Sequence, residues 1–154
     1  MPIKILFNLY LVMKIALASD HAGFALKNVI IKYLEENNYE SIDFGCYSDV
    51  SCDYADYAHP LAFAVENDVN LVGIVCCGSG NGINMTVNKH QGIRSAICWN
   101  EEIAKLARTH NDANVCSLPS RFISFDKAVE IVHIFLNTDF EGGRHLNRIK
   151  KIPI

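Results

Sequence analysis

Short apolar runs alternate with longer amphipathic segments along most of this chain. The runs are rich in Ile, Val, Leu and Ala, which is typical of strands buried on both faces of a sheet. They cover Lys14 to Ala18, Ser41 to Phe44, Leu71 to Cys76, Arg94 to Ile97 and Asn114 to Ser117. The segments with helical period are Phe24 to Asn37, Tyr57 to Asn67, Gly82 to Asn88, Asn100 to Thr109 and Ser124 to Asn137.

Strict alternation of strand and helix predicts an α/β fold. We expect a three-layer, Rossmann-like arrangement in which a five-stranded parallel sheet is flanked by helices. In such sheets ligands bind beyond the carboxyl ends of the strands, where the strand order reverses. Polar residues follow four predicted strands, at Asp20 and His21, Asp43 to Gly45, Cys77 to Gly82, and Cys98 to Asn100. The pattern therefore predicts a site at one edge of the sheet.

The stretch LVGIVCCGSGNG, from Leu71 to Gly82, delivers a cysteine from a strand into a glycine-rich turn. Without a Cβ, its three glycines let several backbone N–H groups converge near Cys77, and the next helix adds partial positive charge. Such surroundings stabilise a thiolate relative to a thiol, and they also stabilise an oxyanion on a substrate. The alternative is a buried cysteine before an ordinary strand-to-helix turn. The density of glycine favours a functional site.

The loop itself leaves other chemistries open. It lacks the Lys-Ser/Thr of a P-loop, and its third glycine comes one residue too early for the dinucleotide fingerprint G-x-G-x-x-G. A nucleotide-binding module therefore stays a weak alternative. Hydrolysis by a cysteine–histidine pair is another, because Cys77 and His110 could be juxtaposed in the fold.

Three further groups of polar residues are candidates for the site. Asp20 and His21 share the predicted sheet edge with the thiol loop, whereas His110 and Asn111 close an amphipathic segment and offer a proton donor and an amide for a sugar hydroxyl. Arg144 and Arg148 are four residues apart, so on a helix they share one face and grip a phosphate, unless that face is simply solvated. We interpret the remaining histidines as surface or packing residues and leave two residues before the second helix undecided: His59, His90, His133 and His145, and Asp53 and Tyr54.

Composition narrows the class of protein. The chain has 154 residues, half of them hydrophobic, which suits one domain with a substantial core. Its net charge of -3 and scattered basic residues argue against binding to nucleic acid. The six cysteines form no C-x-x-C pair, which favours reduced thiols in a cytoplasmic protein over a zinc site or a disulfide framework.

The first 18 residues imitate a secretory signal, with a lysine, an apolar run and an Ala-x-Ala ending. Lys14 interrupts the apolar run, however, and cleavage after Ala18 would remove the first predicted strand. We therefore expect residues 1–12 to be an N-terminal extension and residues 13–154 to form the domain. The uninterrupted run is too short to span a membrane, so we expect no membrane partner.

Several motifs together resemble the B-type ribose-5-phosphate isomerases, a family that also includes isomerases of galactose 6-phosphate and allose 6-phosphate. The resemblance runs from Met13 to about Arg148. Its pieces occur in the family's order: SDHAGFALK from Ser19, DYADYA from Asp53, CGSGNGI from Cys77, NK at Asn88, GIR from Gly92, HNDANV from His110, SRF from Ser120 and EGGRH from Glu141.

The resemblance implies isomerisation of ribose 5-phosphate to ribulose 5-phosphate without a metal or organic cofactor. Cys77 is then the base that moves the proton between C2 and C1, His110 opens the furanose ring with help from Asp20, and Ser79 holds the enediolate oxygens. Substrate-binding residues implied by the family are Asp20, His21, Gly78, Ser79, Gly80, Asn81, Gly82, Asn111, Arg121, Arg144 and Arg148. It further implies a homodimer, with a tetramer as the alternative, whose active sites are shared between subunits.

Comparison with the family's pattern identifies the candidate base, shows two departures and leaves the substrate preference open. Relatives without the cysteine use a glutamate just after the glycine loop, but Ile83 stands there, so Cys77 is the only candidate base in the loop. Ser79 replaces a common threonine and Ala55 a common proline, and neither change removes a needed functional group. The preference for pentose or hexose phosphates depends on the depth of the pocket.

Overall fold

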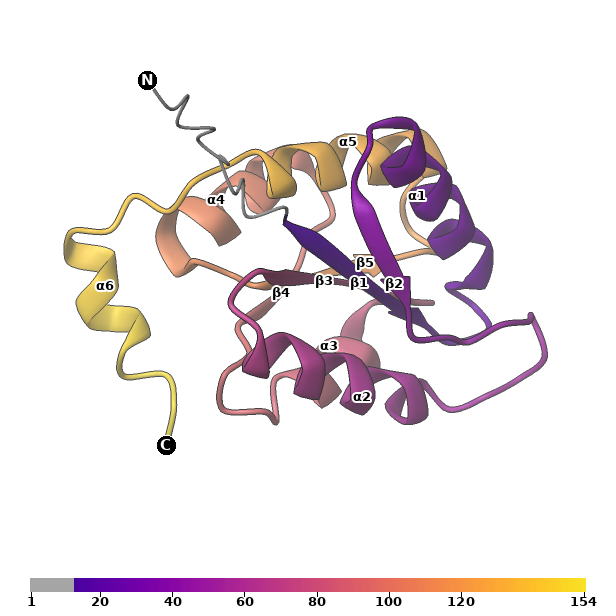
Figure 1. The fold of residues 1–154 in the computed structure, drawn as a ribbon, viewed down its shortest axis with the longest axis horizontal. Helices are drawn as coiled ribbons and strands as arrows, with labels where there is room; N and C mark the ends of the chain where they lie inside the picture. Colours follow the sequence, from indigo (N-terminus) through magenta and orange to yellow (C-terminus); the bar gives the residue numbers. More distant parts are fainter. Residues whose placement is uncertain (1–12) are drawn as a thin grey trace, which may run out of the picture.

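One parallel sheet of five strands organises residues 13–154, which the computed structural model describes (Figure 1). The strand order is β2-β1-β3-β5-β4. The strands are β1 (Lys14–Ser19), β2 (Glu40–Asp43), β3 (Leu71–Cys77), β4 (Ser95–Ile97) and β5 (Val115–Pro119). All neighbouring pairs are parallel, as the alternation of elements predicted. The expected N-terminal extension, residues 1–12, lies outside the described residues.

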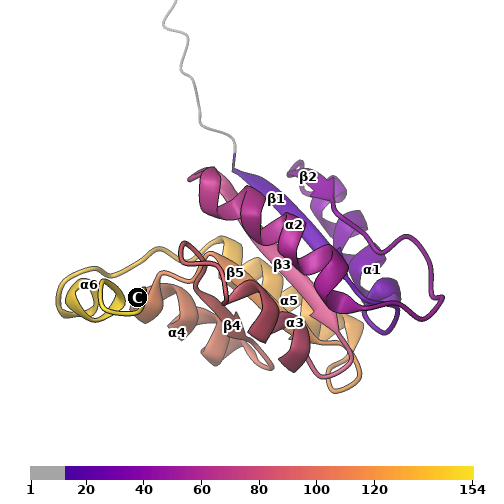
Figure 2. The same ribbon diagram turned by 90° about the horizontal axis from the view of Figure 1, so that it is seen from below.

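Helices cover both faces of the sheet, which confirms the three-layer architecture (Figure 1). The helices are α1 (Phe24–Glu36), α2 (Tyr54–Asn67), α3 (Asn81–Val87), α4 (Glu101–Asn111), α5 (Phe125–Leu136) and α6 (Arg144–Ile149). One apolar core contains residues of α1, α4 and α5, and the other contains residues of α2 and α3. Figure 2 shows α2 lying across β1 and β3. No helix of residues 13–154 is long and apolar enough to cross a membrane.

The pleat of each strand divides its side chains between the two cores. In β1, Ile15 and Leu17 enter the core under α1 and α5, while Ala16 enters the core under α2. The same alternation separates the adjacent thiols of Cys76 and Cys77. Cys76 is fully buried, and burial together with the neighbouring Cys77 raises its pKa well above the ordinary value. Only Cys77 therefore reaches the end of the strand beside the glycine loop.

Three boundaries differ from the sequence prediction by more than one residue. Helix α4 ends at Asn111 rather than at Thr109. Helix α2 begins at Tyr54, three residues before the predicted Tyr57, because Asp53 is extended and the helix starts directly after it. Strand β5 continues to Pro119 rather than ending at Ser117, because it pairs with β3 as far as Cys77. The extension of β5 thus follows from its pairing with another strand, which a local pattern does not contain.

The strand order reverses between β1 and β3, since β2 lies on one side of β1, and the three strands that follow β2 in the chain all lie on the other side. In doubly wound sheets the crevice beyond the carboxyl ends of two such strands is the usual place for a ligand. Asp20 follows β1 and Gly78 follows β3, so the predicted polar residues stand at this crevice.

Candidate active site

A cavity of about 400 Å³ opens at the carboxyl ends of β1 and β3, and we call it the thiol pocket. It brings together the predicted residues that follow β1 with residues of the glycine loop, and adds four others from α2 and nearby turns. The predicted groups Asp43 to Gly45 and Cys98 to Asn100 do not line it. Its lining consists of Asp20, His21, Ala22, Tyr54, Cys77, Gly78, Ser79, Gly82, Arg121 and Phe122. Gly80 and Asn81 belong to the same loop but do not line the cavity.

The turn after β1 holds Asp20 rigidly in the wall of the thiol pocket. Asp20 is buried, its backbone N–H donates to the Cys76 carbonyl at 3.2 Å, and its Oδ1 accepts the Gly23 N–H at 3.0 Å. A Cβ on Gly23 would lie 2.3 Å from the Cys76 oxygen, so only glycine lets α1 begin this close to β3. One carboxylate oxygen of Asp20 is therefore bonded to the turn, and the residue lines the cavity.

His21 is fastened to the loop between β2 and α2. Its Nδ1 lies 3.3 Å from both the backbone nitrogen and the backbone oxygen of Cys52. Burial and then the neighbouring Cys46 thiol raise the pKa of Cys52, which therefore stays a neutral thiol beside this histidine. With Nδ1 engaged by the backbone, Nε2 is the ring nitrogen left for a ligand.

The glycine loop is held from below by the segment that follows β5. The Cys77 carbonyl accepts from the backbone N–H of Ser120 at 3.0 Å and from its hydroxyl at 2.9 Å, and Gly78 accepts from the Arg121 N–H at 3.0 Å. Gly80 has a φ of 77°, in the left-handed region where glycine is favoured. These bonds fix the backbone around a thiol that is only 4% exposed.

Tyr54 is a pocket residue that the sequence left undecided. Its ring packs directly on Gly82, where a Cβ would come within 2.4 Å of the ring carbon Cζ. The third glycine of the loop is thus needed for close packing by an aromatic side chain from α2. Nothing in the local sequence distinguishes this tyrosine from its neighbours, because the contact joins residues 28 positions apart.

The other predicted residues lie at the opposite edge of the sheet. Helix α4 returns from the end of β4 toward the start of β5, so its last residues, His110 and Asn111, lie near the amino ends of the strands. Arg94, which precedes β4, donates from Nε to the Asn111 carbonyl at 3.0 Å. The alternative that Cys77 and His110 pair within one chain is therefore wrong, because their elements end at opposite edges.

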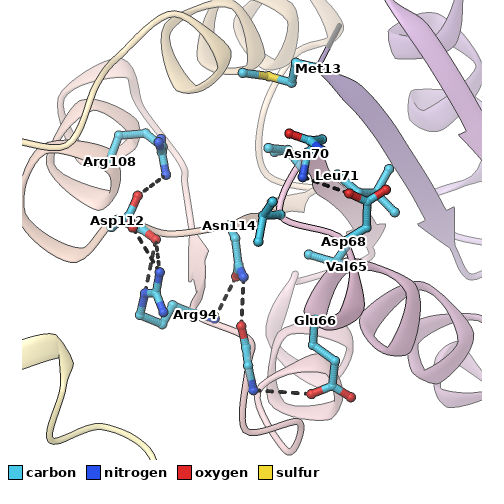
Figure 3. Close-up of a pocket in the computed structure, with 13 residues that line it drawn as sticks. Met13, Val65, Glu66, Asp68, Asn70, Leu71, Arg94, Arg108, Asp112 and Asn114 are labelled. Carbon is cyan, nitrogen blue, oxygen red and sulfur yellow. Dashed lines mark hydrogen bonds and ion pairs between the residues drawn. The ribbon is translucent and has the colours of Figure 1, made fainter. Parts of the chain in front are cut away.

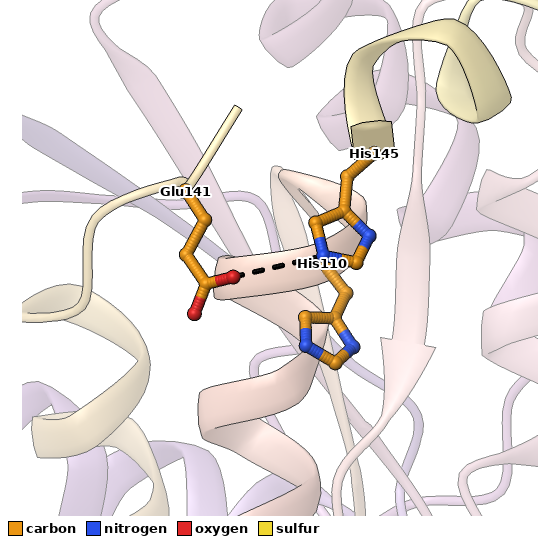
Figure 4. A group of neighbouring side chains, drawn as sticks. All are labelled: His110, Glu141 and His145. Carbon is orange, nitrogen blue, oxygen red and sulfur yellow. Dashed lines mark ion pairs between the residues drawn. The ribbon is translucent and has the colours of Figure 1, made fainter. Parts of the chain in front are cut away.

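His110 forms a compact group with two residues from the C-terminal segment, which we call the histidine cluster (Figure 4). Its ring stacks on that of His145, with centroids 4.2 Å apart and planes inclined by 15°. Nε2 of His145 lies 3.6 Å from Oε2 of Glu141. His145 is buried, and burial, His110 and Arg144 lower its pKa. His145 is thus a packing residue, one of the two roles that the sequence predicts for it, and it packs on the candidate catalytic residue His110.

Arg144 and Arg148 are exposed on α6, next to the histidine cluster. Their spacing of four residues places them on one face of the helix, as predicted. Like His110 and Asn111, neither lines the thiol pocket within residues 13–154. One chain thus divides the predicted site into two separate halves.

A larger cavity, about 470 Å³, also lies at the amino ends of the strands (Figure 3). Three of its charged side chains bind one another: Asp112 contacts Arg108 at 3.0 Å and Arg94 at 3.1 Å. Asp112 ends α4 in a left-handed conformation, with a φ of 44°. Because these charges are already paired, we assign this group of ion pairs, the Asp112 network, a structural role in joining α4 to β4 and β5.

Comparison with known proteins gives consistent matches. The profile of the Ribose/Galactose Isomerase family matches residues 15–152. A probable ribose-5-phosphate isomerase B of Mycoplasma pneumoniae is 45% identical over 139 residues, which cover 90% of this chain and 91% of that protein.

Solved structures agree. A crystal structure of a ribose 5-phosphate isomerase from Thermotoga maritima superposes with a TM-score of 0.89 at 45% identity, covering 92% of this chain and 97% of that one. Ribose-5-phosphate isomerase B from Mycoplasma genitalium, solved with bound ribulose-5-phosphate, has a TM-score of 0.87 at 41% identity and covers 90% of this chain and 93% of that one.

Proposed function

This chain belongs to the ribose/galactose isomerase family, and we infer that it interconverts ribose 5-phosphate and ribulose 5-phosphate in the non-oxidative branch of the pentose phosphate pathway. The observation that carries this inference is the thiol pocket, where Cys77 ends a buried strand beside a glycine loop at the reversal of strand order. The relative from Mycoplasma genitalium that binds ribulose-5-phosphate supports the same substrate class.

Cys77 acts as the base. Its thiolate takes the proton from C2 of the open-chain aldose and returns it to C1, so that the carbonyl moves from C1 to C2 through an enediolate. A proton next to a carbonyl is removed only if the enediolate is stabilised, and the glycine loop has the donors for this task. Ser79 and the amides of Gly78 to Gly82 hold its oxygens. A positioned general base contributes about 10²- to 10⁴-fold to such a step.

Ring opening needs a second acid–base group, because ribose 5-phosphate is mostly a closed ring. His110 donates a proton to the ring oxygen as its bond to C1 breaks, and the C1 hydroxyl loses its proton to form the aldehyde. Asp20 assists at the sugar hydroxyls, with Asn111 as a further hydroxyl partner. The phosphate is bound by the charged and polar side chains His21, Arg121, Arg144 and Arg148. Held far from the reacting carbons, it supplies binding energy that positions them.

The residues of the thiol pocket and the group of His110, Asn111, Arg144 and Arg148 lie at opposite edges of the sheet within one chain. The proposed site therefore requires two chains. In a homodimer with a two-fold axis, the thiol pocket of one subunit faces His110, Asn111, Arg144 and Arg148 of the other, and the axis repeats the composite site. A tetramer built from such dimers keeps the same sites. All six cysteines are free thiols, which suits a cytoplasmic enzyme.

A panel of phosphorylated sugars tests the proposed function. Purified protein should isomerise ribose 5-phosphate and act poorly on allose 6-phosphate and galactose 6-phosphate, with ribulose 5-phosphate detected by its ketose absorbance or by NMR. Efficient turnover of a six-carbon substrate instead would move the enzyme to another branch of the family. Binding of a nucleotide with no isomerase activity would overturn the proposal.

A further inference from the structure

The histidine cluster has the composition of a transition-metal site. His110, Glu141 and His145 offer two imidazole nitrogens and one carboxylate oxygen that all lie within 4.8 Å of one another (Figure 4). Two histidines and a glutamate are one of the ligand sets that bind zinc with an open fourth position. In the part of the chain from residue 13 onward, no other group of three such side chains converges in this way.

One pair in the cluster already has nearly the separation that a metal requires. With metal–ligand bonds of about 2.1 Å, two ligand atoms on a tetrahedral ion are about 3.4 Å apart. Nε2 of His145 and Oε2 of Glu141 are 3.6 Å apart. An ion bound between them therefore needs almost no movement of either residue.

His110 needs a rotation of its ring to become the third ligand. The rings of His110 and His145 are stacked within 15° of parallel, so their nitrogen lone pairs run side by side and do not converge. His110 is only partly buried, at the end of α4, and its ligand atom already lies within 4.8 Å of those of the other two residues, so a turn of its ring is the movement that the site requires.

The backbone holds the three ligands together without the ion. The Glu141 N–H donates to the carbonyl of Thr109, the residue before His110, at 3.1 Å. Glu141 and His145 are four residues apart at the start of α6. The exposed side chains of Arg144 and Arg148 place positive charge on the same helix, and this charge weakens the binding of a cation. The balance suits an ion that binds reversibly better than a resident cofactor.

We propose that His110, Glu141 and His145 form a reversible inhibitory site for a divalent transition-metal ion of the zinc class. The ion binds the lone pair of an imidazole nitrogen of His110, which is then no longer available to exchange a proton with the sugar during ring opening. Metal binding therefore removes the acid–base function of His110. The binding itself depends only on the cluster, whereas the inhibition rests on the proposed function.

Titration with zinc chloride tests the binding. Zinc affinity is measured for the full chain by competition with the chromogenic chelator 4-(2-pyridylazo)resorcinol, for wild type, Glu141→Gln, His145→Gln and the control Glu130→Gln, which removes an exposed carboxylate on α5. We expect the wild type to bind one zinc ion per chain. The two cluster variants should lose this ion or bind it at least tenfold more weakly, and the control should bind it with unchanged affinity. Repeating the titration in a Cys77→Ala background removes the pocket thiol as a competing ligand.

Turnover measured with and without zinc tests the inhibition. Zinc should inhibit the wild type, and EDTA should restore it. Glu141→Gln should keep its turnover without zinc and resist inhibition, since Glu141 is exposed and outside the proposed catalytic set. Equal zinc affinity in wild type and Glu141→Gln would overturn the site, even if His145→Gln does not fold.

The two proposals fail in different ways. Cluster-dependent binding that leaves turnover unchanged would overturn the inhibitory role alone. If the wild type lacks isomerase activity in the absence of zinc, the proposed function is wrong, and the titration still decides the metal site.

Discussion

The carboxyl and amino edges of the sheet present their polar groups in different ways. At the carboxyl edge the thiol pocket is defined by backbone contacts: Gly23 lies against β3, Tyr54 packs on Gly82, and Ser120 holds the Cys77 carbonyl. At the amino edge, long side chains on helix ends dominate, and Arg144 and Arg148 are exposed. The carboxyl edge therefore holds the Cys77 thiol in one position, whereas the arginine side chains of the amino edge extend into solvent.

This difference matches what isomerisation demands of each half. Proton transfer at carbon requires the base and the oxyanion donors to keep fixed positions, because small displacements cost much of the rate. Capture of a phosphate and opening of a ring are served by side chains that approach from a distance. We therefore call the carboxyl edge, which also contributes His21 and Arg121 to the proposed phosphate site, the reaction half, and the amino edge the capture half, of a site that our proposal completes with a second chain.

Removing the thiol should have the largest effect on the reaction half. Cys77→Ala is expected to lose about 10²- to 10⁴-fold in kcat, because a general base is removed, while ribose 5-phosphate binding by calorimetry stays largely intact. Alkylation of the wild type should likewise inactivate it, and substrate should protect. Near-normal turnover of the variant would show that Cys77 is not the base.

Removing His110 should affect the capture half in a substrate-dependent manner. His110→Ala is expected to reduce turnover of ribose 5-phosphate by about 10²-fold or more, because ring opening loses its acid–base group. An open-chain aldose phosphate has no ring to open, so its isomerisation should suffer far less. Equal losses on the cyclic and the open-chain substrate would assign His110 to the proton transfer at carbon or to structure.

Mixing the two variants tests whether the halves belong to different chains. Cys77→Ala and His110→Ala proteins, unfolded and refolded together in equal amounts, form heterodimers with one doubly mutated site and one intact site. Random pairing makes half the dimers mixed with half their sites working, so activity should return to about a quarter of wild type. No recovery, with heterodimers verified by native mass spectrometry, would refute the shared site and leave the isomerase assignment standing.

Truncating either arginine of α6 should act on substrate binding. Arg144→Ala and Arg148→Ala are each expected to raise KM for ribose 5-phosphate by about tenfold or more, since a charge-assisted hydrogen bond to phosphate is lost. Lys151→Ala, which removes an exposed cation just beyond α6, serves as the control for a general charge effect. Unchanged KM in both arginine variants would mean that this face of the helix is only solvated.

The smallest effect, on stability alone, is expected from the Asp112 network at the amino edge. Asp112→Asn should lower the free energy of unfolding by about 1 kcal/mol, because partly exposed ion pairs to Arg94 and Arg108 are lost, and 1 M salt should shrink the difference. Asp112→Ala should cost more, since asparagine tolerates the left-handed conformation and alanine does not. Urea denaturation measures both, and identical losses would show that the backbone conformation contributes nothing.

Local patterns were sufficient for the elements and for the reaction half. Apolar runs and helical periods predicted all five strands, because burial on both faces leaves the same short-range signature wherever it occurs. The residues from Cys77 to Gly82 are contiguous, and Asp20 and His21 follow a neighbouring strand, so their meeting follows from the parallel topology alone.

The capture half could not be assembled in this way. His145 stacks on a residue 35 positions earlier, and the Glu141 N–H bonds the carbonyl of Thr109, which belongs to another segment. Such contacts depend on how helices pack, which the period of one segment does not encode.

The sequence by itself determined the alternating α/β architecture, the thiol loop and the family motifs, because each depends on residues close together in the chain. Only the tertiary structure decided which distant residues gather around His110. The physical reason is that α6 packs against α4 and brings Glu141 and His145 to the end of that helix, a contact between separate segments that no local pattern contains.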